Sequence, residues 1–527
     1  MARGGTGDRG GHRNVAQLGG RAGHRQFARH VQLVIRRGNR IAGIAAPLGR
    51  ARRAAAVRRG QGTDRGRILG GPRPAILRRP RPPRHRCRAA AAHGLGTQRA
   101  RLDGSRGADR AAVNVYFHTF GCKANQYDTE RVREAFDANG AVVVDDPALA
   151  DLAIINSCTV TNESEVKLRR LVRHVANSSH AQTIVMGCAA ALDNGVIAAL
   201  PSVRAVVANA EPGTVLRAAG IDDVGAQHAA PPLGTKSRAL LKIQDGCDEH
   251  CTFCATTLAR GNNRSRSVAE LVDEARALAE HHAEIVLTGV HIGTWGLGAR
   301  DSGVVTPGPS PEPRAPSLAG LLEALIAAVP QVRFRLSSIE ATEVDDRLAR
   351  LLIEAPRNLA AHLHAPLQSG ANRVLKRMGR HWYTAESYRA RIEWLAERLP
   401  VFGLGADVIA GFPSETDADH QASLTLLRAL PFTYLHVFPF SVRRDAPAAR
   451  LPGQVPPDVI RQRARELREV GEAKAAAHRL RRRGQTADGV VTGRLKGQVE
   501  VMTEDYLSVY LVTDLWDGRP RFEVTVN

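Results

Sequence analysis

Short apolar runs alternate with amphipathic stretches along most of the chain from residue 113 onward. Near the start, the runs 113–120, 151–157 and 183–187 have the composition of buried strands, and the stretches 126–138 and 162–173 have helical periodicity. Strands that alternate with helices in this way form a parallel, doubly wound sheet. We therefore expect a flavodoxin-like α/β domain over residues 113–222.

A second alternation follows a linker at 223–235. Its six strand-like runs are ALLKIQ, EIVLTG, VRFRLSS, HLHAP, LGADVIAG and YLHVFPF, and the helical stretches between them lie near 268–282, 318–328, 343–354, 384–398 and 415–429. Six βα units predict a partial (βα)6 barrel over residues 236–470, with its active site at the carboxyl ends of the strands. The Pro- and Gly-rich segment 296–317 predicts a surface loop.

The last part of the chain, 471–527, changes pattern again. A basic helix is predicted from Pro457 to Arg483, and after it apolar and polar residues alternate between glycine turns. Such alternation predicts a small antiparallel β-barrel. The basic helix could contact phosphate groups, and we expect His478 within it to lie at the surface.

Charge alters this picture only at the amino terminus. The 527 residues carry a formal net charge of +22, which alone would suggest a nucleic-acid binder. Residues 1–110, however, hold 27 arginines, four aspartates and no lysine or glutamate, so the rest is nearly neutral. This extension has one phenylalanine and little periodicity. We expect residues 1–112 to be disordered. The extension is explained either by a start codon assigned too far upstream or by a role as an RNA-binding arm.

Cysteine usage and apolar content indicate the compartment. No run of 18 apolar residues occurs, which predicts a soluble protein without a membrane partner. Of the seven cysteines, six form two sets of three beyond the extension. This distribution suits metal ligation in a reducing environment better than a disulfide framework, so we expect a cytoplasmic protein. We also expect a monomer.

The segment DGCDEHCTFC carries the densest chemistry, because Cys247, Cys251 and Cys254 are spaced C-x3-C-x2-C. A closed structural metal site needs four ligands, and no fourth cysteine lies nearby. Three thiolates on a four-iron cluster leave one iron open to a substrate. The alternative is a zinc knuckle completed by His250 or by a remote residue.

The other set, Cys122, Cys158 and Cys188, follows three strands of the first domain. The carboxyl ends of parallel strands lie at one edge of a sheet, so these cysteines should converge. A single cysteine there is most often a small buried hydrophobe, but three in register are hard to explain in that way. Asn125 and Asn156 flank them and are expected to orient backbone or substrate.

Both cysteine sets resemble those of the radical S-adenosylmethionine methylthiotransferases. The similarity lies in C-x3-C-x-aromatic-C followed by ARGNNRSRS, and in GCKANQYDTE, INSCTVTNESEVKLRR and VMGCAA. It implies a 4Fe–4S cluster on the C-x3-C-x2-C set, with S-adenosylmethionine on the open iron. It also implies a second 4Fe–4S cluster on the three strand-end cysteines, so all six cysteines would be catalytic and metal-binding.

Further strand-end segments resemble cofactor-binding motifs of this family, namely LTGVHIG, SSIE, LHAPLQSGANRVLKRMGR and GADVIAGFPSET. The resemblance implies that Ser338, Glu340, Gln368 and Asp407 contact S-adenosylmethionine, whose cationic sulfur and zwitterionic end need such polar groups. Taken alone, Glu340 or Asp407 could simply cap a helix. Two departures, ATTLARG after the last cysteine and SVRRDAPAA in place of S-x-R-x-G-T-P-A-A, leave local loop geometry open.

The resemblance also implies a reaction and partners. It is strongest to the branch that adds a methylthio group to C2 of N6-threonylcarbamoyladenosine 37 in tRNA, so the tRNA anticodon loop and an unidentified electron donor are expected partners. Residues 471–527 resemble a shortened TRAM domain, which binds RNA, although a packing module is an alternative. Other branches act on isopentenyladenosine 37 or a ribosomal-protein aspartate. Outside the family, an iron–sulfur redox sensor or electron carrier, or a purely RNA-binding protein, remains possible.

Overall fold

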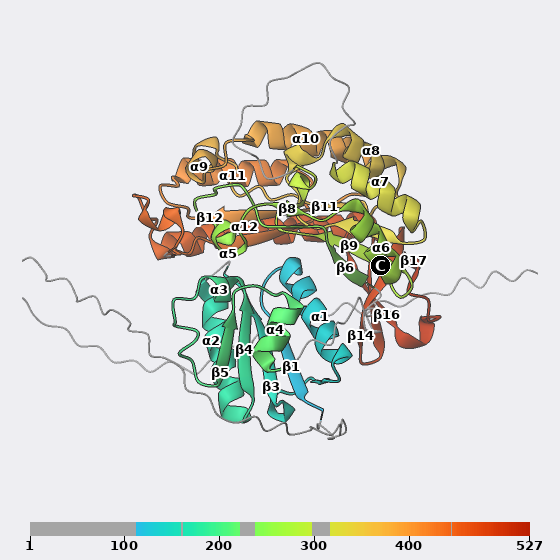
Figure 1. Ribbon diagram of the computed structural model, residues 1–527. Coiled ribbons are helices and arrows are strands. Elements are labelled where there is room, and N and C mark those ends of the chain that lie inside the picture. The colour runs from blue at the N-terminus through green and yellow to red at the C-terminus, as the bar shows by residue number, and fades with distance from the viewer. Residues whose placement is uncertain (1–111, 160–161, 222–237, 298–316, 444) are drawn as a thin grey trace, which may run out of the picture. The chain divides into compact units, whose positions relative to one another are not determined.

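The computed structural model describes residues 112–159, 162–221, 238–297, 317–443 and 445–527, all of which fall in one structural unit (Figure 1). The linker and nearly all of the extension lie outside these residues, as does most of the loop 296–317. The predictions made for those segments are therefore not compared with the structure.

The amino-terminal region contains a five-stranded parallel sheet with the order β2-β1-β3-β4-β5. This is the flavodoxin-like order, so the predicted fold of this region is confirmed. Its strands are β1 (Asn114–Thr119), β2 (Val142–Val144), β3 (Leu152–Ser157), β4 (Gln182–Gly187) and β5 (Val203–Val207). Its helices are α1 (Lys123–Ala138), α2 (Asn162–Ser178), α3 (Cys188–Ala191) and α4 (Pro212–Ala219).

Helices on both faces explain why the central strand β3 is apolar along its whole length. Ile154 packs with Phe136 of α1, whereas the next residue, Ile155, packs on the other face with Leu168 and Val172 of α2. All of these side chains are buried. Successive residues of a strand point to opposite faces, so a strand covered on both faces has no polar side.

Six further parallel strands form a partial barrel, as predicted. Two three-stranded sheets, β10-β9-β6 and β11-β12-β13, are joined by the bridges Phe334–Leu359 and Ser338–His364. The strands are β6 (Arg238–Lys242), β9 (Glu284–Thr288), β10 (Arg333–Leu336), β11 (His362–His364), β12 (Gly403–Ala410) and β13 (Tyr434–Pro439). The helices are α5 (Thr256–Arg260), α6 (Val268–Ala279), α7 (Leu318–Ala328), α8 (Asp346–Glu354), α9 (Asn372–Arg377), α10 (Ala385–Arg398) and α11 (Asp417–Ala429). A short antiparallel pair, β7 (Gln244–Asp245) and β8 (Arg264–Ser265), flanks the barrel.

Alternation along β12 fixes which side chains face the barrel lumen. Leu404, Ala406 and Val408 are buried in the hydrophobic core between the strands and their covering helices. The residues between them therefore point to the opposite, inner face. Asp407 is one of these, and it pairs in register with His436 of β13.

Helix α12 (Pro457–Arg482) leads into a four-stranded antiparallel sheet, ordered β16-β15-β14-β17. The strands are β14 (Thr486–Leu495), β15 (Gln498–Met502), β16 (Ser508–Val512) and β17 (Arg521–Thr525), which agrees with the predicted small β domain. Helix α12 carries many charges, and neither it nor another described helix is long and apolar enough to cross a membrane.

The turn between β15 and β16 covers the amino-terminal end of the barrel. Arg335 of β10 donates hydrogen bonds to the carbonyl oxygens of Thr503 (2.8 Å) and Glu504 (3.1 Å). A side chain at Gly403, the first residue of β12, would collide with the Asp505 carbonyl. The same turn buries His478, which lies 2.8 Å from an Asp505 carboxylate oxygen and is 4% exposed. The prediction of a surface His478 is therefore wrong.

Candidate active site

The loop 246–255 carries Cys247, Cys251 and Cys254 from β7 into helix α5. Two backbone hydrogen bonds hold it, one from the Cys247 amide to the carbonyl of Gly261 just after α5 (3.0 Å) and one from the Cys254 amide to the carbonyl of Cys251 (3.1 Å). These hydrogen bonds bend the loop so that the three thiols lie close enough to affect one another electrostatically.

Arg380 lies against the middle cysteine of this loop. Its Nη1 donates to Cys251 Sγ at 3.4 Å, and its other amino group pairs with Glu340, which also accepts from the Trp382 indole. Burial raises the pKa of Cys251 to about 12, an effect that Arg380 opposes and the neighbouring thiols reinforce. Three ionised thiolates would repel one another here, so they need a bound cation or metal cluster to be stable.

His291 lies beside the first cysteine of the loop. Its Nδ1 is 3.7 Å from Cys247 Sγ, and its Nε2 is 2.6 Å from a carboxylate oxygen of Glu343. Although burial opposes it, these hydrogen bonds raise the pKa of His291 to about 10. The third cysteine, Cys254, lies 3.0 Å from the Thr256 hydroxyl. Each sulfur of this set therefore has a polar neighbour.

The second set of cysteines gathers at the carboxyl ends of β1, β3 and β4. Asn125 Oδ1 lies 3.7 Å from Cys122 Sγ and 3.8 Å from Cys188 Sγ. Gly121 has φ +111°, and an added Cβ would lie 2.9 Å from the Cβ of Cys158. A glycine is thus required before Cys122, because both its conformation and the close approach exclude a side chain.

Two buried asparagines hold this sheet edge together. The Asn125 amide donates to Asn156 Oδ1 (3.1 Å) and to the Ser157 carbonyl (2.9 Å), while the Asn156 amide donates to the Asn125 carbonyl (2.9 Å). Both side chains therefore orient the backbone of the cysteine-bearing turns, one of the two roles expected for them.

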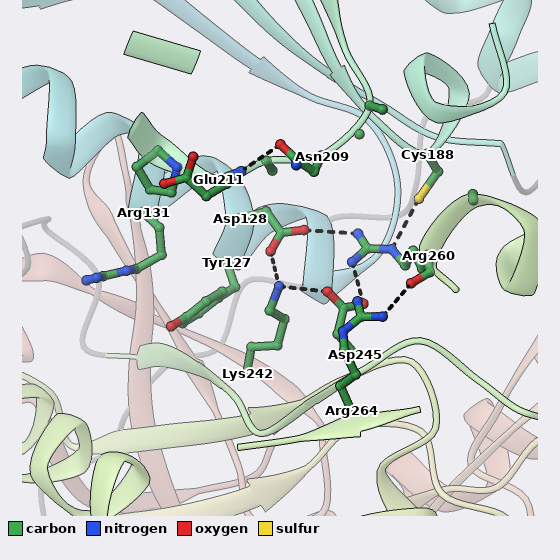
Figure 2. A pocket seen from close by; sticks show the side chains of 15 residues that line it. Tyr127, Asp128, Arg131, Cys188, Asn209, Glu211, Lys242, Asp245, Arg260 and Arg264 are labelled. Atoms are coloured by element: carbon green, nitrogen blue, oxygen red, sulfur yellow. Dashed lines mark hydrogen bonds and ion pairs between the residues drawn. The ribbon is translucent and has the colours of Figure 1, made fainter. Parts of the chain in front are cut away.

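Arg260, the last residue of α5, contacts a cysteine of the strand-end set (Figure 2). Its Nε donates to Cys188 Sγ at 3.2 Å and its Nη2 to Asn125 Oδ1 at 2.6 Å. The same guanidinium pairs with Asp128 (3.0 Å) and Asp245 (2.8 Å). A residue six positions after Cys254 thus reaches a cysteine of the other set.

A cavity of about 380 Å³ borders this network (Figure 2). Burial disfavours a charge on Asp245, but Arg260 and Lys242 outweigh it and lower the pKa of Asp245 to about 2. The polar lining residues are Tyr127, Asp128, Arg131, Cys188, Asn209, Glu211, Lys242, Asp245, Arg260 and Arg264. Cys188 is therefore accessible from a polar cavity that holds charges of both signs.

The spacing of the thiols tests which metal group they could hold. A single zinc with tetrahedral thiolate ligands needs sulfur atoms about 4 Å apart. Among the described residues, only two groups have all their ligand atoms within 4.8 Å of one another, and neither contains a cysteine. The thiols of neither set thus all lie within 4.8 Å of one another, an arrangement that suits a larger cluster better than one zinc ion. His250, the alternative zinc ligand, is exposed.

The four residues predicted to contact S-adenosylmethionine lie in different surroundings. Glu340 is buried and, through Arg380, lies next to Cys251. Gln368 is 9% exposed and has φ +64°, and its backbone bridges Val408 of β12. Ser338 is exposed just beyond β10. Asp407 lies between two histidines, His364 at 2.9 Å and His436 at 3.2 Å.

Sequence reasoning named no role for five side chains that surround these groups. These side chains are Arg260, His291, His364, Arg380 and His436. All five lie in segments named above as strands or family motifs, so those segments were a usable signal. What the sequence lacked was the partner of each, because every one of these contacts joins distant parts of the chain.

Comparison with known proteins agrees with this geometry. Residues 114–208 match the uncharacterized protein family UPF0004, and residues 241–427 match the Radical SAM superfamily. The threonylcarbamoyladenosine tRNA methylthiotransferase MtaB of Bacillus subtilis is 36% identical over 374 residues, which cover 67% of this chain and 79% of that protein. The tRNA-2-methylthio-N(6)-dimethylallyladenosine synthase of Erythrobacter litoralis is 32% identical over 404 residues, covering 72% and 87%. A solved radical S-adenosylmethionine methyltransferase, TsrM of Kitasatospora setae, gives a TM-score of 0.45 at 13% identity, covering 64% of this chain and 77% of that one.

The matched barrel and its cysteine loop define a radical S-adenosylmethionine enzyme. More narrowly, the chain belongs to the tRNA methylthiotransferase family, as its identity to the relatives over most of their length shows. It is a transferase, and its cofactors are 4Fe–4S clusters and S-adenosylmethionine. The family prediction made from the motifs is therefore confirmed.

Proposed function

We propose that this enzyme adds a methylthio group to C2 of N6-threonylcarbamoyladenosine at position 37 of tRNA, in the cytoplasm. The name of the Bacillus subtilis relative, a threonylcarbamoyladenosine tRNA methylthiotransferase, supports this substrate. The isopentenyl (dimethylallyl) nucleoside is the second candidate, because a synthase for that product is 32% identical.

The observation that carries the proposal is the contact of Arg260 with Cys188. Arg260 ends the helix that directly follows the C-x3-C-x2-C loop, and Cys188 belongs to the strand-end set. One side chain therefore reaches from the helix that follows the C-x3-C-x2-C loop to a cysteine of the other set. Sulfur transfer needs such proximity, because a short-lived substrate radical must meet the sulfur before it meets solvent.

We assign Cys247, Cys251 and Cys254 to the cluster that holds S-adenosylmethionine, and the strand-end set, Cys122, Cys158 and Cys188, to a second cluster. When bound, these groups supply reductive cleavage of S-adenosylmethionine to a radical able to remove an unreactive aromatic hydrogen, and a sulfur for transfer. The described thiols fit such clusters because their spacing exceeds that of a single metal site.

In this proposal the protein's own residues hold charge and exclude water. Arg380 and His291 lie against Cys251 and Cys247, where their N–H groups can offset negative charge on the sulfurs. Glu340 holds Arg380 in position through their ion pair.

Polar groups around the lumen would bind the two ends of S-adenosylmethionine. We assign this role to Ser338, Glu340, Gln368 and Asp407. Within the described residues, Asp407 uses only Oδ1 for its contacts with the two histidines, which leaves Oδ2 for the cofactor.

The carboxyl-terminal sheet and helix α12 are proposed to bind the tRNA. Three arginines of α12, Arg461, Arg465 and Arg468, are exposed and spaced three to four residues apart, which brings them to one face of the helix. A row of exposed guanidinium groups suits contacts with successive phosphates. In the sheet, Arg494 lies over the ring of Trp516 at 4.6 Å.

Nucleoside mass spectrometry of tRNA tests the proposed function. A deletion strain should lose 2-methylthio-N6-threonylcarbamoyladenosine and accumulate the threonylcarbamoyl precursor. Complementation with the wild-type gene should restore it, whereas the Cys251→Ala gene should not. Persistence of the methylthio nucleoside in the deletion strain would refute the substrate, and loss of the isopentenyl derivative instead would establish the second candidate.

A further inference from the structure

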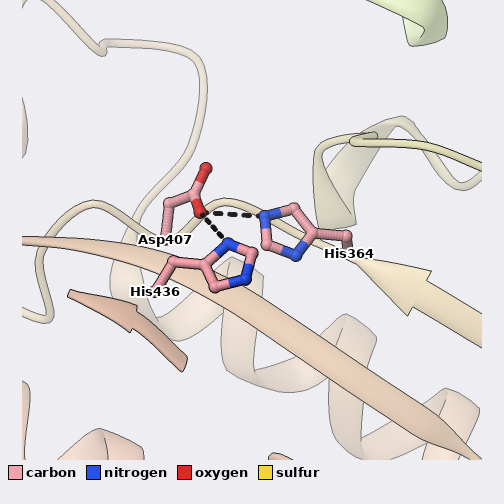
Figure 3. A group of neighbouring side chains, drawn as sticks. All are labelled: His364, Asp407 and His436. Carbon is pink, nitrogen blue, oxygen red and sulfur yellow. Dashed lines mark hydrogen bonds and ion pairs between the residues drawn. The ribbon is translucent and has the colours of Figure 1, made fainter. Parts of the chain in front are cut away.

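A polar layer crosses the inner face of the barrel at His364, Asp407 and His436, on the neighbouring strands β11, β12 and β13 (Figure 3). Asp407 Oδ1 lies 2.9 Å from His364 Nε2 and 3.2 Å from His436 Nδ1. These contacts lower the pKa of Asp407, although burial opposes the change. The carboxylate is therefore ionised and accepts a hydrogen bond from each ring.

Tyr434 and His362 continue this set of hydrogen bonds on the side of His364 away from Asp407. The Tyr434 hydroxyl lies 3.0 Å from His364 Nδ1 and 2.9 Å from His362 Nε2. The Tyr434 hydroxyl therefore links the two histidine rings, and His364 in turn contacts Asp407 through Nε2. The ring of Tyr506, from the carboxyl-terminal domain, stacks on His362 with centroids 4.5 Å apart. The side of the layer that faces Tyr434 and His362 is thus covered by protein.

His436 is the open end of this chain of hydrogen bonds. Its side chain is 57% exposed, whereas that of His364 is 9% exposed. Because Nδ1 is held by Asp407, Nε2 is the atom left to meet a ligand. Depending on protonation, Nε2 accepts a hydrogen bond from a hydroxyl or donates one to a carboxylate, but it offers nothing to an apolar group.

We propose that His436, oriented by Asp407, binds the polar N6 substituent of the modified adenosine and so selects a hydroxyl- and carboxylate-bearing substituent over an apolar one. This inference rests on the proposed function and names the group that determines its substrate. A site that hydrogen-bonds a substrate disfavours an analogue without the polar group, because binding that analogue takes water away from the site's polar atoms and puts nothing in its place. An isopentenyl substituent lying over His436 would displace water from Nε2 without offering it a hydrogen bond.

The same three side chains could in principle hold a divalent cation, since their ligand atoms lie within 4.8 Å of one another. Asp407 Oδ1 also lies at ordinary hydrogen-bond distances from both rings, which is the arrangement the inference uses. Metal binding is therefore one of the outcomes that the test below separates.

Steady-state kinetics on two tRNAs test the inference. The substrates are one tRNA sequence carrying either threonylcarbamoyladenosine or isopentenyladenosine at position 37, given to the full-length, reconstituted enzyme. In His436→Leu, the ratio of kcat/KM for the first over the second should fall about tenfold to a hundredfold, mostly through KM, as expected for loss of one hydrogen bond to a charged or strongly polar group. His436→Gln keeps a polar end and should lose less.

His281→Leu is the matched control, because His281 is an exposed histidine at the end of α6, outside the barrel lumen. It should keep the wild-type ratio. An unchanged ratio in both His436 variants would overturn the inference, as would zinc or another divalent metal that wild type binds and His436→Leu loses. If His436→Leu does not incorporate its iron–sulfur clusters, the same ratio of kcat/KM measured on His436→Gln decides the question. Wild-type enzyme without activity on the threonylcarbamoyl tRNA would instead refute the proposed function.

Discussion

Two arginine networks mark the two ends of the barrel, and they differ in what the arginines touch. At the amino-terminal end, the fully buried Glu284 accepts from Arg333 (2.6 Å) and Arg335 (3.0 Å), and carbonyl groups of the turn between β15 and β16 satisfy further N–H groups. At the carboxyl end, Arg260 touches a cysteine sulfur and borders a cavity.

The difference separates stability from chemistry. The contacts of Glu284 with Arg333 and Arg335 join side chains that are fully buried, so they stabilise the fold. In the Arg260 network, one hydrogen bond is donated to the thiol of Cys188, which borders a cavity. We expect this contact to contribute less to stability than the buried ion pairs of Glu284. Arginine ion pairs thus stabilise the amino-terminal end of the barrel, and at the carboxyl end they position a guanidinium group against a cysteine.

The largest effect should come from the cysteines of the open end. Cys251→Ala removes a proposed ligand of the cluster that holds S-adenosylmethionine, so its cleavage under dithionite should fall to background. Cys158→Ala should abolish methylthio transfer but retain most of the cleavage, because it belongs to the other set. Chromatographic assay of 5′-deoxyadenosine and of the tRNA nucleosides measures both. Equal loss of cleavage in the two variants would contradict the division of roles.

The closed end should give the largest effect on stability. Glu284→Gln leaves buried arginines without their counter-charge, and removing one partner of a buried ion pair costs about 3–5 kcal/mol. The midpoint of urea unfolding, followed by circular dichroism, measures this loss. Glu323→Gln is the control, since its ion pair with Arg347 is 40% exposed on both sides and should change the stability by about 0.5 kcal/mol or less. Similar midpoints for the two variants would remove the contrast between the ends.

A smaller effect is expected at Arg260. Arg260→Gln should slow methylthio transfer about tenfold to a hundredfold, because Cys188 and Asn125 lose a charged donor. Lys242 remains beside Asp128 and Asp245, so the unfolding midpoint should shift less than in Glu284→Gln. The electron paramagnetic resonance signal of the second cluster should change as well, which a purely structural role would not predict.

Arg264→Gln tests the specificity of that result. Arg264 lines the same cavity, but its Nη1 bonds only to the carbonyls of Arg260 and Asn262. It should leave both transfer and spectrum near wild type. Identical spectra in wild type and Arg260→Gln would show that the contact with Cys188 does not matter to the cluster.

The fold class followed from the sequence because the central strands of the parallel sheets are short apolar runs, whereas the edge strands β2 and β5 and the two-residue strands β7 and β8 were not predicted. The convergence of Cys122, Cys158 and Cys188 also followed, since parallel strands share an edge. The Glu284 network did not. Arg333 and Arg335 alternate with apolar residues, and this periodicity tells which residues share a face of the strand but not what covers that face.

His478 was misjudged for the same reason, as the carboxyl-terminal turn that buries it comes 27 positions later in the chain. The contact between Arg260 and Cys188 crosses 72 positions and two separate sheets. Contacts of this kind depend on how whole elements dock, and nothing local in the sequence encodes them.

Helix α12 links the barrel to the carboxyl-terminal sheet. Its 26 residues run without a break from the barrel to the carboxyl-terminal sheet, a length of about 39 Å at the usual rise. Gly471, near its middle, lies directly against Leu435 of β13, and its last turn is held by the Asp505 turn. If tRNA binds along this helix as proposed, the helix would hold it at a fixed distance from the barrel. Only a nucleotide at that distance from the bound segment could then enter the lumen.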